Sequence, residues 1–163
     1  MSRSSINVWA RRRARRTLLQ ALYAWQMTDA EFDEIVRQFT PDQLKSADRD
    51  YLCECLRGVM DRVTTLDPLF EPYLDRRIDE LDYVERAILR AGSYEMKERL
   101  DVPARVVIDE WVELAKRFGA AESFRYVNGV LDRVARDLRT AELGQTAPAE
   151  DGAGSGQSGT EKD

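Results

Sequence analysis

The sequence contains no histidine and only two cysteines among its 163 residues. Histidine is the commonest general base and the commonest transition-metal ligand in proteins, so its absence argues against both kinds of site. Cys53 and Cys55 lie two residues apart in a helical pattern, which places their side chains about 200° apart around the helix. They therefore cannot share a metal ion or form a disulfide with each other, and we interpret them as reduced thiols.

Long apolar runs and phosphate-binding loops are also missing. No stretch of about 18 apolar residues could cross a membrane, and no hydrophobic segment typical of a signal peptide appears near the start. We therefore expect a cytoplasmic protein without a membrane partner. Glycine-rich nucleotide motifs are absent, and the carboxylates of Asp109, Glu110 and Glu113 have no nucleophile or histidine beside them. These absences predict that the chain is not an enzyme and uses no metal or cofactor.

Charge is distributed unevenly along the chain, which has 30 acidic and 25 basic residues and a net charge of -5. Residues 1–16 hold six arginines and no acid, so the remaining residues sum to -5 - 6 = -11. Positive charge at the start of a helix opposes the helix dipole and needs a compensating interaction. The cluster indicates an anionic partner, although a solvated basic helix start remains an open alternative.

Apolar residues recur at three- and four-residue spacing throughout, and no segment alternates as a strand would. We predict a single all-α domain of about seven helices. The first three are expected at residues 10–27, at 32–39, and from a cap at Ser46 or Asp48 to Val63. The other four are expected from an N-cap at Asp67 followed by Pro68, from Asp82 to Glu95, from Pro103 to Gly119, and at 121–138.

The chain ends are expected to differ from this helical part. Residues 1–9 are predicted to form a flexible N-terminal arm, and residues 10–140 the helical domain that carries the binding functions. Residues 141–163 are acidic and glycine-rich with almost no large apolar side chain. Such a segment cannot offset its ordering entropy by burial, so we predict a disordered tail.

Two predicted helices have apolar or aromatic side chains on the face that should be exposed to solvent. On the first, Leu19 and Tyr23 continue the row of Arg12 and Arg16 instead of the apolar stripe, which indicates a surface with basic and apolar halves. Packing beneath the second helix is an equally open explanation. On the last helix Tyr126 lies off the core stripe, where an exposed ring could stack an unpaired base with about 1 to 3 kcal/mol. A boundary tyrosine with a solvated hydroxyl is the alternative.

Four separated blocks of sequence together resemble a known family. They are ARRRARRTLLQALYAWQ at 10–26, LFEPYLDRRIDELDYVERAILRAGSYEM at 69–96, DVPARVVIDEWVELAKRFG at 101–119 and FRYVNGVLD at 124–132. Their order and spacing resemble the NusB family of bacterial transcription antitermination factors over residues 8–138. The resemblance implies seven helices in two packed helical bundles. It also implies binding of boxA-type single-stranded RNA together with ribosomal protein S10, in a larger complex with RNA polymerase and other antitermination factors that supports transcription of ribosomal RNA operons.

The resemblance also assigns roles to individual positions. Arg11, Arg12, Arg13 and Arg15 match the arginine-rich RNA-binding motif of the family, whereas Arg16 stands where some relatives have an acid. Arg125 and Tyr126 match a basic residue and an aromatic ring near the RNA, and Glu122 matches an acid that tempers RNA affinity. Tyr23, Glu80 and Glu85 match positions that face S10, although Glu85 is also explained as a partner of Asp82 at a helix start.

Two other functions remain open at this point. The chain could be a helical protein-protein interaction module without direct RNA binding, in which the arginines contact an acidic protein surface. Similar helical domains also precede ribosomal RNA cytosine methyltransferases. We expect that the chain ends before any catalytic domain could begin, so that function would need a separate subunit.

Overall fold

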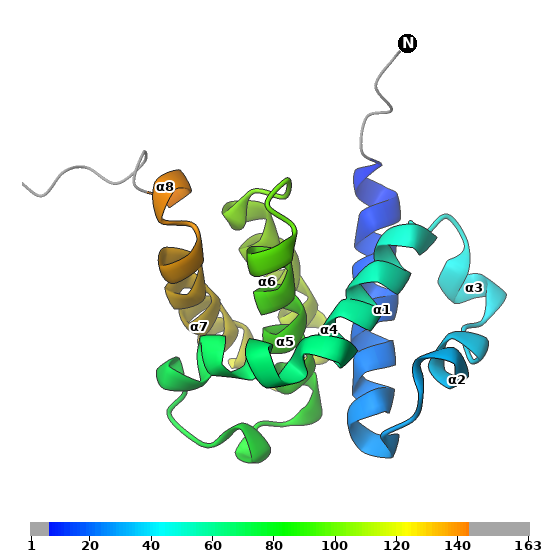
Figure 1. Cartoon of the computed structure of the whole chain (residues 1–163), viewed down its shortest axis with the longest axis horizontal. Coiled ribbons are helices and arrows are strands. Elements are labelled where there is room, and N and C mark those ends of the chain that lie inside the picture. Colours follow the sequence, from blue (N-terminus) through cyan, green and yellow to red (C-terminus); the bar gives the residue numbers. More distant parts are fainter. Residues whose placement is uncertain (1–6, 144–163) are drawn as a thin grey trace, which may run out of the picture.

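The computed structural model describes residues 7–143, and within this range it contains helices and no strands (Figure 1). The α-helices are α1 (Val8–Thr28), α2 (Phe32–Arg37), α3 (Pro41–Leu44), α4 (Arg49–Phe70), α5 (Tyr83–Glu98), α6 (Ala104–Phe118), α7 (Ser123–Leu138) and α8 (Thr140–Leu143). Two 3-10 turns, η1 (Glu71–Tyr73) and η2 (Ile78–Glu80), lie between α4 and α5. The predicted all-α class is confirmed.

The helices form two bundles that meet along α5. In the first bundle α1 packs against α2, α3 and α4, and in the second α5, α6 and α7 pack against one another. Figure 1 shows α1 with the short α2 and α3 at one side of the molecule and α7 with α8 at the other. Because α5 also contacts α1 and α4, it is buried along most of its length, from Ala87 to Met96. One continuous apolar core therefore joins the two bundles.

Helix α1 begins two residues earlier than predicted. The side chain of Asn7 accepts a hydrogen bond from the backbone N–H of Ala10 at 3.0 Å, which satisfies a free donor of the first turn. Val8 and Trp9, expected in the flexible arm, therefore belong to the helix. Residues 1–6 of that predicted arm lie outside the described residues.

The expected helix start at Asp67 and Pro68 is wrong. Both residues lie inside α4, which runs on to Phe70 with a kink at Arg62, where φ is -117° and ψ is 18°. The carboxylate of Asp67 does not cap a helix, because it pairs with Arg90 of α5 at 2.8 Å. The ion pair with Arg90, a residue distant in the sequence, therefore determines the position of the Asp67 side chain, and the local cap pattern does not.

The C-terminal boundary also differs from the prediction. Arg139 is buried, and its guanidinium donates to the backbone oxygens of Glu95 and Met96 near the end of α5 and of Arg99 and Val102 just after it. Glu142 of α8 accepts from the N–H of Ala104 at 2.7 Å, at the start of α6. These bonds order residues 141–143, which were expected in the tail. Residues 144–163 lie outside the described residues.

Candidate nucleic-acid interface

Arg15 lies inside the protein, in an ion pair with Glu95 of α5. Its side chain is 3% exposed, and its Nη2 lies 2.9 Å from Oε1 of the fully buried Glu95. Tyr51 donates its hydroxyl hydrogen to the same carboxylate, and Nε1 of Trp111 donates to it at 2.5 Å. Burial lowers the pKa of Arg15, but the hydrogen bonds and charge of Glu95 outweigh this and raise that pKa above its usual value.

The assignment of Arg15 to RNA binding therefore needs correction, because its guanidinium is engaged within the core. Its sequence position contained the signal for this burial. Arg15 is three residues before Leu18, a member of the apolar stripe, and Glu95 continues the buried face of Ile88 in α5. A cation and an anion on two apolar faces that pack together are expected to pair.

Arg11 is also largely covered. Its guanidinium lies 4.3 Å from the centroid of the Tyr51 ring, and its nitrogens are 3.9 Å from Asp48 and 4.0 Å from Asp101. Its side chain is 13% exposed. The charge of Arg11 adds to the positive potential near the start of α1, but little of the side chain can contact a ligand.

The remaining arginines of the motif line a groove between α1 and α6, which we call the basic groove. It encloses about 710 Å³, and a smaller hollow of about 300 Å³ between α1 and α3 shares Arg13 and Arg16 with it. The residues that line the basic groove are Trp9, Arg12, Arg13, Arg16, Glu110, Glu113, Leu114, Lys116 and Arg117. Five cations and two carboxylates give the lining a net charge of 5 - 2 = +3.

Three of these cations have no acidic partner within residues 7–143. Arg12 pairs with Glu110 at 3.0 Å and Lys116 pairs with Glu113 at 3.1 Å. Arg13, Arg16 and Arg117 make no ion pair in the described part of the chain, and all three are exposed. Unpaired guanidinium groups in one groove can bind the phosphates of a polyanion.

The aromatic and cationic members of the groove that lie outside the arginine motif are Trp9, Lys116 and Arg117. Trp9 is 66% exposed in the first turn of α1. The spacing of Trp9, Arg13 and Arg16 by four and then three residues places them on one helix face, and this signal is present in the sequence. Lys116 and Arg117 belong to a different helix, so no local pattern connects them with the arginine motif.

Tyr126 lies in a separate shallow hollow, of about 530 Å³, at the outer side of α7. Its ring is half-buried, its hydroxyl accepts from the N–H of Asp75 at 3.2 Å, and the Arg76 guanidinium lies 4.9 Å from the ring centroid. A Cβ added to the neighbouring Gly129 would meet nothing within 4 Å, so the space beside the ring is open. Base stacking on Tyr126 stays a prediction.

Arg125 and Glu122 form an ion pair at the rim of this hollow. Nε of Arg125 lies 2.8 Å from Oε2 of Glu122, and both side chains are largely exposed. A phosphate that approaches Arg125 must compete with this carboxylate. The pair gives a physical reason for the expectation that Glu122 tempers RNA affinity.

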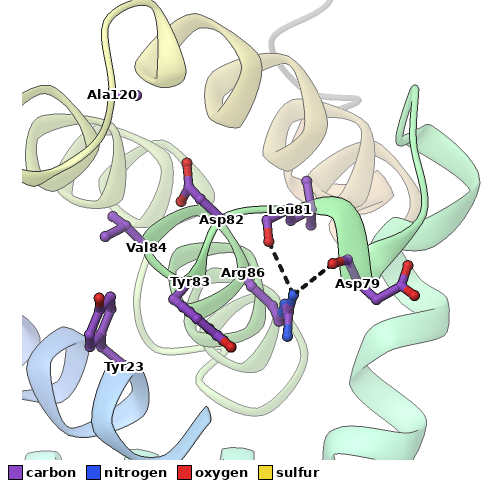
Figure 2. A pocket seen from close by; sticks show the side chains of 8 residues that line it. All are labelled: Tyr23, Asp79, Leu81, Asp82, Tyr83, Val84, Arg86 and Ala120. Carbon is purple, nitrogen blue, oxygen red and sulfur yellow. Dashed lines mark hydrogen bonds between the residues drawn. The ribbon is translucent and has the colours of Figure 1, made fainter. Parts of the chain in front are cut away.

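Tyr23 lies at the other end of α1, in an open hollow of about 510 Å³ that we call the tyrosine hollow (Figure 2). Its ring meets that of Tyr83 edge to face, with centroids 5.7 Å apart. Both tyrosines are 39% exposed, whereas Leu19, one turn earlier, is buried. The other lining residues are Asp79, Leu81, Asp82, Val84, Arg86 and Ala120.

Backbone contacts fix the cationic side of the tyrosine hollow. Arg86 donates to the carbonyl oxygens of Asp79 and Leu81 at 3.3 and 3.1 Å, as the dashed lines in Figure 2 show. Glu80 is exposed nearby, where its carboxylate accepts from the N–H of Arg77 at 3.2 Å. The hollow therefore has a held cation beside its two tyrosine rings and an acidic rim.

Glu85 does not share this exposure. Its residue is 7% exposed, and burial together with the neighbouring Asp82 raises the pKa of its carboxyl to about 7. Asp82 accepts from the N–H of Glu85 at 2.7 Å and caps α5, as predicted. The expectation that Glu85 faces a partner needs correction, because its side chain lies under the helix start.

Other kinds of site find no support in the described part of the chain. Between residues 7 and 143, no three histidine, cysteine, aspartate or glutamate side chains are grouped as a metal site would require. Nor does this range include a helix of the length and apolar character needed to cross a membrane.

Comparison with known proteins gives the family. The NusB family model matches residues 12–136. The transcription antitermination protein NusB of Alcanivorax borkumensis is 56% identical over 140 residues, which cover 85% of this chain and 93% of that protein. The structure of T. maritima NusB has a TM-score of 0.73 at 29% identity and covers 82% of this chain and 96% of its own.

A second solved structure contains the antitermination factors NusB and NusE in complex with dsRNA. Its matching chain has a TM-score of 0.64 at 27% identity, and the match covers 80% of this chain and 98% of that one. The relatives are regulators of transcription, which confirms the expectation that the chain is not an enzyme. The chain belongs to the NusB family of transcription antitermination proteins.

Proposed function

We propose that the chain binds boxA-type single-stranded RNA in the basic groove and ribosomal protein S10 at the tyrosine hollow. The bound complex joins RNA polymerase and other antitermination factors in the bacterial cytoplasm and supports transcription of ribosomal RNA operons. The proposed RNA binding rests on three exposed guanidinium groups that have no acidic partner in residues 7–143, those of Arg13, Arg16 and Arg117.

Electrostatics of this groove predict how the RNA affinity depends on salt. Each phosphate that a cation neutralises releases condensed counterions, at a slope of roughly 0.7 per phosphate for a single strand. Three contacts give a slope of about -2 for the logarithm of the binding constant against the logarithm of the salt concentration. Arg15 is excluded from this number because its charge is neutralised by Glu95.

Support for the protein partner comes from the tyrosine hollow and from a relative. A related NusB was solved with NusE, the antitermination name of S10. Exposed tyrosines are enriched at the centres of protein interfaces, because they supply a large contact area with few rotatable bonds. The fixed rings of Tyr23 and Tyr83 supply such a surface.

A protein-only function is the second candidate, and one observation favours it. Arg12 already pairs with Glu110, so carboxylates are suitable partners for the motif. An acidic protein surface could engage Arg13 and Arg16 in the same manner. The two functions differ in whether RNA binds in the absence of S10.

Titration of fluorescein-labelled boxA RNA with the full chain, with and without S10, tests the proposal. We expect binding of the single strand with the stated salt slope, and tighter binding when S10 is present. Because the related complex holds dsRNA, a duplex of the same sequence is the matched comparison. Preference for the duplex would contradict the single-strand assignment, and a flat salt titration would favour the protein-only function.

A further inference from the structure

Trp9 is exposed at the rim of the basic groove. Of the three tryptophans, Trp111 is buried and Trp25 is half-buried, whereas Trp9 is 66% exposed. Its ring lines the same groove as Arg13, Arg16 and Arg117. The arginine-rich motif, which begins at Arg11, does not include it.

The helix places Trp9 at one end of the row of cations. Arg13 and Arg16 follow it by four and seven residues, or about 6 and 10 Å along the axis. All three side chains project from one face of α1, since these spacings return to the same side of a helix. A strand that follows the row of guanidinium groups therefore passes the indole ring.

Arg12 orders this ring from one side. Its guanidinium lies 5.0 Å from the centroid of the Trp9 ring, and its Nε is held 3.0 Å from Glu110 of α6. A cation over an indole is an attractive arrangement that fixes the ring plane. Because the ring remains largely exposed, the face opposite Arg12 is open to solvent.

We propose that Trp9 stacks an RNA base on the ring face opposite Arg12, while Arg13, Arg16 and Arg117 bind the adjacent phosphates. This inference rests on the proposed RNA function and adds a residue outside the arginine motif. Aromatic rings stack any base, so Trp9 supplies affinity for an unpaired strand and distinguishes it from a duplex, whose bases are already stacked.

The test uses labelled oligoadenosine and oligouridine of equal length with the full chain and three variants. Trp9→Ala should bind oligoadenosine roughly five- to tenfold more weakly, and Trp9→Phe should stay within about twofold of the parent chain. The salt slope should not change in Trp9→Ala, because no charge is removed. Leu100→Ala is the matched control, since Leu100 is 68% exposed and does not line the groove.

Intrinsic fluorescence gives an independent readout. Stacking should quench the tryptophan emission of the parent chain when RNA is added, and this quenching should disappear in Trp9→Phe. Unchanged affinity in Trp9→Ala, with a normal salt slope, would overturn the stacking inference and leave the RNA function intact. If the parent chain itself binds neither oligonucleotide nor boxA RNA, both the inference and the proposed function fail.

Discussion

The two ends of α1 present different surfaces although they belong to one continuous helix. The first half lines the basic groove with long cationic side chains, of which Arg13 and Arg16 have no acidic partner in residues 7–143. The last turns present Tyr23, whose ring is positioned by Tyr83. A flexible cationic surface suits a polyanion of variable path, whereas a fixed aromatic hollow suits a partner of defined shape.

The two surfaces of α1 should respond differently to salt. Phosphate contacts release counterions and weaken as salt rises, whereas apolar contacts between rings are much less sensitive to salt. One helix can therefore bind two ligands that respond differently to the same solution. Between these ends, Arg15 fixes α1 to α5 through its ion pair with Glu95.

Removal of the ion pair between Arg15 and Glu95 should have the largest effect, which is a loss of folding stability. Arg15→Met leaves the buried Glu95 carboxylate without its cation, which should lower the free energy of unfolding by about 3–5 kcal/mol. Urea unfolding measures this loss. Adding Glu95→Gln should recover part of it, because glutamine still accepts from Tyr51 and Trp111. A stable Arg15→Met variant that has lost RNA affinity would show instead that Arg15 reaches the RNA.

Charge reversal in the groove should separate the two ends of α1. Arg13→Glu combined with Arg16→Glu should weaken binding of boxA RNA by roughly thirtyfold or more at low salt and flatten the salt slope by about 1 to 2. Binding of S10 alone should not change. Fluorescence anisotropy measures the first quantity and calorimetry the second.

The control for that variant is an equal change of charge elsewhere. Arg37→Glu combined with Arg62→Glu alters two exposed arginines that do not line the groove. Similar losses of RNA affinity in both double variants would mean that net charge, and not the groove, determines binding. Thermal melting of each variant checks that the fold is intact.

Truncation at the tyrosine hollow should produce the reverse pattern. Tyr23→Ala removes an exposed ring from the hollow and should weaken S10 binding by about 2 kcal/mol, the loss expected of a binding hot spot. RNA binding without S10 should stay unchanged. Met27→Ala is a matched control, since Met27 is exposed on α1 but does not line the hollow. Equal losses in the two variants would contradict a role specific to Tyr23.

Local signals predicted most of the fold. The cap at Asp82 and the start after Pro103 are as predicted, and of the two expected caps Ser46 and Asp48 the structure has Asp48; each depends on residues within one turn. The expected cap at Asp67 failed because its carboxylate pairs with Arg90, 23 residues away. An interaction between helices decided that boundary, and no local pattern contains it.

The candidate site was less accessible to sequence reasoning. The motif identified Arg13 and Arg16 as exposed cations, but it did not separate them from Arg15, whose environment depends on Glu95, 80 residues away. The position of Arg15 along the helix partly predicted its burial, since Arg15 shares the face of Leu18. Lys116 and Arg117 joined the groove only when α6 was placed beside α1.

The smallest expected effect concerns Glu85, next to the tyrosine hollow. Its carboxyl has a pKa of about 7, above the usual 4.5, because of burial and the neighbouring Asp82. The folded protein therefore holds this proton more tightly than the unfolded chain, so the stabilisation is complete below about pH 4.5 and is lost as the pH rises toward 7. Glu85→Gln, which stays neutral, should be about 1–2 kcal/mol more stable than the parent chain at pH 8 and little different at pH 4. Urea unfolding at both pH values measures the difference, and S10 affinity should stay constant because Glu85 is buried; a stability difference independent of pH would contradict the raised pKa.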